Sequence, residues 1–415
     1  MELHFQAISE PQPGSKWKKL FNTHWAAYKD WYISKGKAYY PDDRTSLAQL
    51  KRYMPEMLPT FERFCELAGG EPLAIRFLTG YQPPAYITGC SQAVWSKGSP
   101  QLVRNYDYHP HLSEGTLLHS AWNGREVIAV GDSLWGVVDG MNEEGLAVSL
   151  TFGGRKAVGK GFGIPFILRY VLEFCATVAE AVAALRRIPS HMAYNVTVLD
   201  HKGTFKTVQL APDRPPVVTE ASIATNHQGE IDWPEHAQFS QTLERESFLK
   251  NILAQRHQDA EGVAEAFLKA PLFNTRYTDG FGTVYTAVYR PEEGRMELRW
   301  PEQTWSQSFD NFREDVKKIR YAKEVTTPAP TYADTWTAYE KEWEGAPAEW
   351  SKKVVKIIVD AMGLAGYTEA EKLMDIFTSE TKKRGQIPWE MLADFWSNLG
   401  RTYQQPEAEK EMESD

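Results

Sequence analysis

The chain has 415 residues, of which 42% are hydrophobic and 24% are charged, and this balance excludes a disordered, collagenous or coiled-coil protein. Its formal net charge of −9 repels phosphate backbones, so we expect no nucleic-acid partner. The three cysteines Cys65, Cys90 and Cys175 form neither a disulfide framework nor a zinc motif and suit a reducing compartment. Without a signal-peptide pattern or a run of ~18 apolar residues, the sequence predicts a cytoplasmic protein with no membrane span.

The first part of the chain is predicted to be helical. Large apolar residues such as Trp17, Phe21 and Tyr28 recur at helical spacing within residues 15–82. The pair Pro83-Pro84 then favours an extended backbone.

Short runs of β-forming residues follow, separated by turn residues, and predict hairpins in an antiparallel sheet. The expected strands span residues 90–95, 102–108, 116–121, 126–130, 136–139 and 147–152.

Residues 163–320 mix both types of element, which indicates an α+β fold rather than a doubly wound parallel sheet. Thr177 and Glu180 form a capping box for one of the helices. The expected helices span residues 165–174, 178–188, 235–254 and 260–269, and the expected strands span 194–199, 204–210, 222–225, 283–289 and 296–300.

The C-terminal part is predicted to be separate. Residues 321–330 resemble a linker, residues 331–403 carry apolar stripes typical of a small helical extension, and residues 404–415 form an acidic tail.

The most informative stretch pairs Gly89-Cys90-Ser91 with the segment from Arg104 to Tyr108. A hairpin centred on Gly98-Ser99 would place Cys90 opposite Asp107, within contact distance. A nearby guanidinium would favour the nucleophilic thiolate. However, Arg104 and Asp107 are three residues apart and face opposite sides of an ideal strand, so a bulge or a strand end is needed if both act on Cys90. On spacing alone, such a cysteine is more often a small buried hydrophobe, and the Arg–Asp pair more often structural.

Three further motifs favour the nucleophilic interpretation of Cys90 over the structural one. They are Asp139 to Ala147 (Asp-Gly-Met-Asn-Glu-Glu-Gly-Leu-Ala), Tyr194 to Asp200 (Tyr-Asn-Val-Thr-Val-Leu-Asp) and Ala224 to His227 (Ala-Thr-Asn-His). Together with the two cysteine-hairpin motifs, in this order across residues 15–320, they resemble the isopenicillin N acyltransferase-like (acyl-CoA:6-aminopenicillanic acid acyltransferase) family. This family belongs to the N-terminal-nucleophile hydrolases, with the choloylglycine hydrolases and the acid ceramidase-type amidases as relatives.

The resemblance implies a four-layer αββα sandwich over residues 90–320, with two antiparallel sheets between outer helices. It also implies a precursor that cleaves itself between Gly89 and Cys90. Residues 1–89, here called the leader, would then form a helical light chain that stays bound. Cys90 would carry both the nucleophilic thiol and a free α-amino group, whose ordinary pKa of about 7.7–8.0 suits a base.

The resemblance assigns further roles. Arg104 resembles the cation beside the thiolate, Asp107 the acid that holds the new amino group, and Asn226 the amide of the oxyanion hole. The backbone N–H of Thr151 is a candidate for the other half of that hole. Arg245 resembles a site arginine, although a solvated helix arginine is an equal alternative.

Asn195, in a predicted strand, is more often a structural hydrogen-bonding residue than a site residue. His109 and His111 have metal-like spacing but lack further ligands, so we expect no metal and no cofactor. The segment Gly159 to Gly163 is more often a mobile loop over the pocket, and contact of Arg155, Lys156 and Lys160 with an anionic acyl carrier such as CoA is the alternative.

The predicted reaction makes or breaks a linear amide through a Cys90 thioester, on a small N-acyl or acyl-thioester substrate; acyl-CoA is one such donor. Water or an amine would take the acyl group, and the sequence does not separate hydrolase from transferase. The alternatives are a non-maturing binding protein with the same fold and an assembly protein that uses the C-terminal helices. Homo-oligomerisation is left open.

Overall fold

The computed structural model describes residues 2–34, 41–277 and 281–321. The chain divides into two compact units, Met1–Ala329 and Pro330–Asp415. The predicted helical extension and acidic tail, and nearly all of the predicted linker, lie outside the described residues.

Among the described residues, the larger sheet contains nine strands in the order β10-β9-β8-β7-β6-β5-β4-β1-β16. All of its neighbouring strands pair antiparallel except β1 and β4, which are parallel. The bounds are β1 Glu2–Ser9, β4 Thr116–Ser120, β5 Val127–Asp132, β6 Gly136–Asn142, β7 Leu146–Phe152, β8 Tyr194–Asp200, β9 Phe205–Leu210, β10 Val217–Thr219 and β16 Asp315–Arg320.

In the part of the chain that the structure describes, the second sheet has seven antiparallel strands, six of them in the order β11-β2-β3-β13-β14-β15, while β12 pairs with β13. Their bounds are β2 Gly89–Trp95, β3 Gln101–Tyr108, β11 Ile223–Ala224, β12 Thr275–Arg276, β13 Phe281–Arg290, β14 Arg295–Trp300 and β15 Gln303–Ser308.

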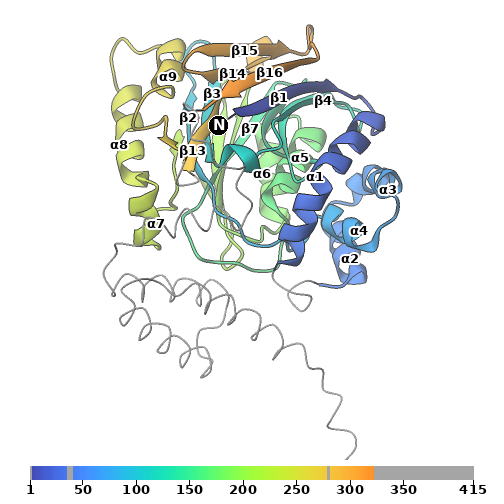
Figure 1. The fold of residues 1–415 in the computed structure, drawn as a ribbon. Coiled ribbons are helices and arrows are strands. Elements are labelled where there is room, and N and C mark those ends of the chain that lie inside the picture. The colour runs from blue at the N-terminus through green and yellow to red at the C-terminus, as the bar shows by residue number, and fades with distance from the viewer. Residues whose placement is uncertain (1, 35–40, 278–280, 322–415) are drawn as a thin grey trace, which may run out of the picture. The chain divides into compact units, whose positions relative to one another are not determined.

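The two sheets face each other and helices cover their outer faces, which confirms the αββα arrangement. Across the inner faces, Gln92 Nε2 donates to Thr197 Oγ1 at 2.7 Å and Arg104 Nε donates to the Leu150 carbonyl at 3.0 Å. Helices α5 (Ile164–Phe174) and α6 (Val178–Arg187) pack on the nine-stranded sheet, whereas α8 (Thr242–Leu253) and α9 (Ala260–Ala266) pack on the seven-stranded sheet (Figure 1).

The central strands are buried on both faces. Every residue of β2, β6 and β7 is buried, because one face meets the other sheet and the opposite face meets helices. Leu249, Val263 and Phe267 of the helical segment α8–α9, for example, form a small apolar core with the outer face of the second sheet. The predicted capping box of Thr177 and Glu180 is confirmed at the start of α6.

Within its described residues the leader contains four α-helices, all in the range predicted to be helical, and also strand β1, which was not predicted. Strand β1 lies between β4 and β16 and completes the larger sheet. Its apolar signal is short, because only Phe5 and Ala7 are buried. The helices are α1 Ser15–Ile33, α2 Asp43–Tyr53, α3 Leu58–Leu67 and α4 Pro72–Leu78, and short 3-10 helices span Pro55–Met57, Pro110–Leu112 and Pro291–Glu293.

Three indole hydrogen bonds join the leader to the rest of the first unit. Trp17 Nε1 donates to the Leu134 carbonyl at 3.0 Å, and Trp135 Nε1 donates to the Leu78 carbonyl at 3.0 Å. Trp122 Nε1 donates to the carbonyl of Glu10 at 2.9 Å. Together with the paired strand β1, these bonds bind the leader independently of the peptide link at Gly89.

One further expectation needs correction, and four strands were not expected. The helix expected over residues 235–254 is two helices, α7 (Pro234–Phe239) and α8, because Gln241 adopts a left-handed φ of 50° between them. The short or polar strands β10, β12, β15 and β16 were not predicted, since they lack a clear apolar alternation. Among the described residues, no helix is long and apolar enough to cross a bilayer.

Candidate active site

The hairpin of β2 and β3 forms as predicted, but its register differs by one residue from the expectation. Cys90 pairs with Tyr106, and Asp107 pairs with Gly89. The reason is the turn, which has five residues between Trp95 and Gln101 and is centred on Gly98 alone, with a left-handed φ of 67°. The expectation that Cys90 lies opposite Asp107 is therefore wrong.

The register decides which side chains share a face, because a shift by one residue exchanges the two faces of a strand. Cys90 and Arg104 point toward the nine-stranded sheet, which we call the inner face of the hairpin. Asp107 points toward the helical side, the outer face. No bulge of β3 is needed, since Arg104 and Asp107 approach different parts of Cys90.

On the inner face, Arg104 contacts the cysteine sulfur. Its Nη2 lies 3.3 Å from Cys90 Sγ, and its Nε donates to the Leu150 carbonyl at 3.0 Å. Thr88 Oγ1 lies 3.8 Å from the same sulfur. A guanidinium fixed in this position stabilises negative charge that develops on the sulfur.

Asp139 on β6 holds the other side of this guanidinium. Its carboxylate accepts from Arg104 Nη1, from Tyr285 Oη at 2.7 Å and from Tyr289 Oη. The side chains of Arg104 and Asp139 are fully buried, so each charge needs the other to offset its loss of water. Burial opposes the charge of Arg104, but Cys90 and Asp139 outweigh it and raise the Arg104 pKa well above its ordinary value.

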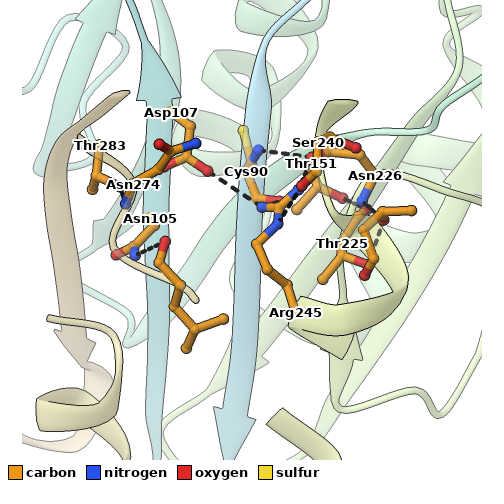
Figure 2. Close-up of polar contacts among 12 residues, drawn as sticks. Cys90, Asn105, Asp107, Thr151, Thr225, Asn226, Ser240, Arg245, Asn274 and Thr283 are labelled. Carbon is orange, nitrogen blue, oxygen red and sulfur yellow. Dashed lines mark hydrogen bonds and ion pairs between the residues drawn. The ribbon is translucent and has the colours of Figure 1, made fainter. Parts of the chain in front are cut away.

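On the outer face, Arg245 of α8 reaches the backbone of Cys90 (Figure 2). Its Nη1 donates to the Cys90 carbonyl at 2.7 Å and lies 3.2 Å from Asp107 Oδ2. Its Nη2 donates to Asn226 Oδ1 at 2.6 Å, and its Nε donates to the Ser240 carbonyl at 2.8 Å. Arg245 is only 2% exposed, so the alternative of a solvated helix arginine is wrong.

Asn226 lies beside the nitrogen of Cys90. The Cys90 N–H donates to Asn226 Oδ1 at 3.1 Å, while Asn226 Nδ2 donates to the Phe152 carbonyl at 3.1 Å. Both Cys90 N and Arg245 are donors, which fixes the orientation of the amide. Its nitrogen carries two hydrogens, and Phe152 takes one of them.

Asp107 is expected to hold the Cys90 nitrogen, but its ion-pair partner is Arg245. Besides Arg245, it accepts from Thr283 Oγ1 at 2.7 Å. Burial raises the pKa of Asp107, while Arg245 and Thr283 oppose this rise. In the continuous chain the Cys90 nitrogen therefore bonds to Asn226, and Asp107 is connected to Cys90 through Arg245 (Figure 2).

Thr151 and Asn195 pair across β7 and β8, next to the segment that carries Asn226. Thr151 Oγ1 donates to the Thr225 carbonyl at 2.8 Å. Asn195 Nδ2 donates to Thr151 Oγ1 and to the carbonyls of Thr225 and His227, at 3.0–3.1 Å. Asn195 thus joins β7 and β8 to the loop after β11, as expected of a structural residue, whereas the Thr151 side chain offers no free donor to a substrate.

The other candidates lie apart from this network. Burial, with His111 nearby, lowers the pKa of His109 to about 4. Across residues 2–34, 41–277 and 281–321, no group of three or more His, Cys, Asp or Glu residues could hold a metal ion. Arg155 is bound by Asp213 at 2.8 Å and by Asp232, so its charge is already compensated.

Sequence reasoning missed three residues of the site. Asp139 starts one of the quoted motifs, yet its spacing gives no sign that it meets Arg104. Tyr285 and Tyr289 are four residues apart on β13 and so share a face, a signal that was available. Their common partner, however, comes from the opposite sheet, which sequence spacing cannot reveal.

Both the sequence and the structure of the chain are similar to known proteins. The family model described as acyl-coenzyme A:6-aminopenicillanic acid acyl-transferase matches residues 95–305. No curated protein matches the chain.

Similar solved structures include three enzymes. A mutant conjugated bile acid hydrolase from Clostridium perfringens has 14% identity and a TM-score of 0.34, and the match covers 58% of this chain and 99% of that one. The Caenorhabditis elegans N-acylethanolamine-hydrolyzing acid amidase ortholog has 20% identity and a TM-score of 0.38, and the match covers 56% of this chain and 100% of that one. Penicillin V acylase from Agrobacterium tumefaciens has 14% identity and a TM-score of 0.39, and the match covers 55% of this chain and 90% of that one.

The family model spans half of the chain; it contains Arg104, Asp107, Asn226 and Arg245, whereas Cys90 lies just before the matched residues. The chain therefore belongs to the acyl-coenzyme A:6-aminopenicillanic acid acyl-transferase family, which is the family that the order of its motifs predicts.

Proposed function

We propose that the chain is a self-processing amidase or acyltransferase that uses Cys90 as its N-terminal nucleophile. The main support for the proposal is that different groups contact the sulfur and the backbone of Cys90. Arg104 Nη2 lies 3.3 Å from Cys90 Sγ, while Asn226 and Arg245 bind the Cys90 nitrogen and carbonyl oxygen. A structural cysteine needs neither arrangement.

Self-processing would begin with attack of Cys90 Sγ on the carbonyl carbon of Gly89. The S–C bond forms, the C–N bond breaks, and the Cys90 nitrogen keeps the electron pair and takes up the thiol proton. The leader is then a thioester on the sulfur. Water adds to this carbonyl and the S–C bond breaks, which leaves a carboxylate on Gly89 and a thiol and α-amine on Cys90.

The mature enzyme would repeat this chemistry on an external acyl donor. The α-amine, with an ordinary pKa of about 7.7–8.0, removes the thiol proton. The thiolate attacks the acyl carbonyl, and the leaving amine or thiol receives the proton. Water or an amine then takes the acyl group from the thioester. An N-acyl compound and an acyl thioester such as acyl-CoA lead to the same intermediate, and no cofactor is needed.

The site residues would divide these tasks. Arg104 stabilises the thiolate, and Asp139 keeps Arg104 in position. Asn226 Oδ1 holds the amine, while the second hydrogen of Asn226 Nδ2 and the Thr151 backbone N–H are the candidates for the oxyanion hole. One such donor is typically worth about 10²- to 10³-fold in rate. Asp107 supports the amine site through Arg245.

The experiment is intact mass spectrometry of the purified full chain during ageing, beside the variants Cys90→Ala and Cys65→Ala. We expect the wild type and Cys65→Ala to give residues 1–89 and 90–415 as separate masses, and Cys90→Ala to stay whole. The two pieces should co-elute in native buffer, because β1 and the indole bonds hold the leader, and separate in denaturant. A wild-type chain that stays whole would favour the non-maturing binding protein instead.

A further inference from the structure

The residue before the nucleophile has no room for a side chain. A Cβ atom added to Gly89 would lie 2.0 Å from Phe281 Cζ, 2.3 Å from Phe281 Cε2 and 3.0 Å from Asp107 Cβ. Real Cβ atoms essentially never approach other atoms to less than 3.0 Å. Gly89 is not among the residues with a positive φ, so the requirement for glycine comes from the Phe281 ring and not from backbone conformation.

The Phe281 ring is held in place from its other side. It is 4% exposed and packs edge-on against Phe239, with ring centroids 4.8 Å apart. The Arg276 guanidinium lies 5.3 Å from the Phe281 ring and 4.9 Å from the Phe239 ring, and its Nη2 donates to the Phe239 carbonyl at 2.7 Å. We call these three side chains the Phe281 wall. A ring in this setting does not swing aside without disturbing its neighbours.

The proposed chemistry connects this wall to the substrate. In self-processing, the acyl group on Cys90 Sγ is the leader, and its α-carbon is that of Gly89. Every later acyl group forms a thioester on the same sulfur, and its carbonyl carbon is bonded to the same atom. We place the α-carbon of a substrate acyl group where the Gly89 α-carbon lies, next to the Phe281 wall.

We propose that Phe281 selects the acyl donor: its α-carbon must carry no substituent in the position that the side chain of an L-amino acid occupies. Acyl groups with a CH₂ next to the carbonyl fit, and α-branched acyl groups of that hand do not. This inference rests on the proposed function and adds the class of acyl group to it. It also makes Phe281 the residue that restricts position 89 to glycine.

The test uses benzyl thioesters of N-acetylglycine, N-acetyl-L-alanine and N-acetyl-D-alanine as probes on the mature enzyme. The two alanine probes have equal intrinsic reactivity, so any difference between them comes from the protein. We expect the wild type to prefer the glycyl over the L-alanyl probe in kcat/KM by about 10- to 200-fold, the range that one extra carbon gives in a shaped pocket. Phe281→Ala should remove most of this preference and leave the glycyl-to-D-alanyl ratio nearly unchanged, because the D methyl group points to the other side of the α-carbon.

Phe281→Leu serves as a second variant if Phe281→Ala folds poorly, and Phe205→Ala, a half-buried phenylalanine on β9, is the matched control that should keep the wild-type preference. Self-cleavage gives an independent measurement. Gly89→Ala should block cleavage, and adding Phe281→Ala should restore it at least in part.

The outcomes separate this inference from the proposed function. If the wild type turns over the glycyl probe but the L-alanyl preference is absent, or persists in both Phe281 variants, the wall does not select the acyl group. If the wild type forms no acyl-enzyme with the glycyl probe, the proposed function fails and this inference fails with it.

Discussion

The two faces of the β2–β3 hairpin contact different atoms of Cys90. The inner face meets the sulfur with a fixed cation, Arg104, which Asp139 holds from the opposite sheet. The outer face meets the peptide backbone of Cys90 through Arg245 and Asn226. Because alternate side chains of a strand point to opposite sides, the groups that contact the sulfur and the groups that contact the backbone of the same residue are kept apart.

This division predicts different effects for the two faces. Changes on the inner face should alter the reactivity of the sulfur in every step. Changes on the outer face should act mainly on cleavage and on the pH dependence set by the nitrogen site. The variants below, from the largest expected effect to the smallest, test whether the faces are separable.

Removal of the sulfur itself should abolish both self-cleavage and turnover. Cys90→Ala should remain a single chain of 47.2 kDa on a denaturing gel. Cys65→Ala is the control, because burial raises the pKa of Cys65 to about 12, so that little of this thiol is present as the thiolate near neutral pH. Cleavage of Cys90→Ala at the normal rate would show that another group is the nucleophile.

Arg245→Lys on the outer face should slow self-cleavage by roughly 100-fold or more, since a lysine cannot reach Cys90 O, Asn226 and Ser240 together and leaves Asp107 poorly paired. The half-time of the full-length band measures this. Lys250→Ala, which changes an exposed cation on the same helix, should cleave normally. Equal half-times for Arg245→Lys and wild type would remove Arg245 from the site.

Asp139→Asn on the inner face should lower the rate of Cys90 alkylation by iodoacetamide by about 10- to 100-fold, the effect known for residues that orient the ligands of a metal ion. Both carboxylate oxygens accept hydrogen bonds, and an asparagine would turn an N–H₂ toward donors on one side. Tyr289→Phe removes one donor only and should have a smaller effect. An unchanged alkylation rate in folded Asp139→Asn would mean that Asp139 does not position Arg104.

The smallest effect should be a shift in pH dependence. Burial raises the pKa of Asp107, so this carboxyl becomes protonated, and its pairing with Arg245 weakens, at a higher pH than for an ordinary aspartate. The Thr283 hydrogen bond favours the carboxylate, and Thr283→Val should therefore raise this pKa further. The acid limb of kcat/KM should move to higher pH by less than about one unit. Tyr285→Phe, on the inner face, should leave the limb in place, and an equal shift in both variants would contradict the separation of the faces.

Much of this arrangement was predictable from the sequence, and the errors in the prediction have physical causes. Local patterns gave most central strands, the cap of α6 and the pairing of β2 with β3. The order of the motifs identified Cys90, Arg104 and Asp107 as candidates. The register was wrong by one residue, because the turn permits more than one centre and only the packing of the whole strand decides between them.

The remaining errors concern contacts between distant segments. Burial of Arg245 beside Cys90 depends on how α8 packs, and Asp139 meets Arg104 only because the two sheets face each other. Strand β1 has too few buried residues to be recognised on its own, and it forms because β4 and β16 leave a place for it. No local pattern records such contacts.

The most direct test of the account is to identify the residue that becomes acylated. The aged protein is incubated with the benzyl thioester of N-acetylglycine, quenched with acid, and analysed by intact and fragment mass spectrometry. We expect two chains of about 10 and about 37 kDa, with the acyl group on Cys90 at the start of the larger chain. An undivided chain, or an acyl group on Cys65 or Cys175, would contradict this expectation.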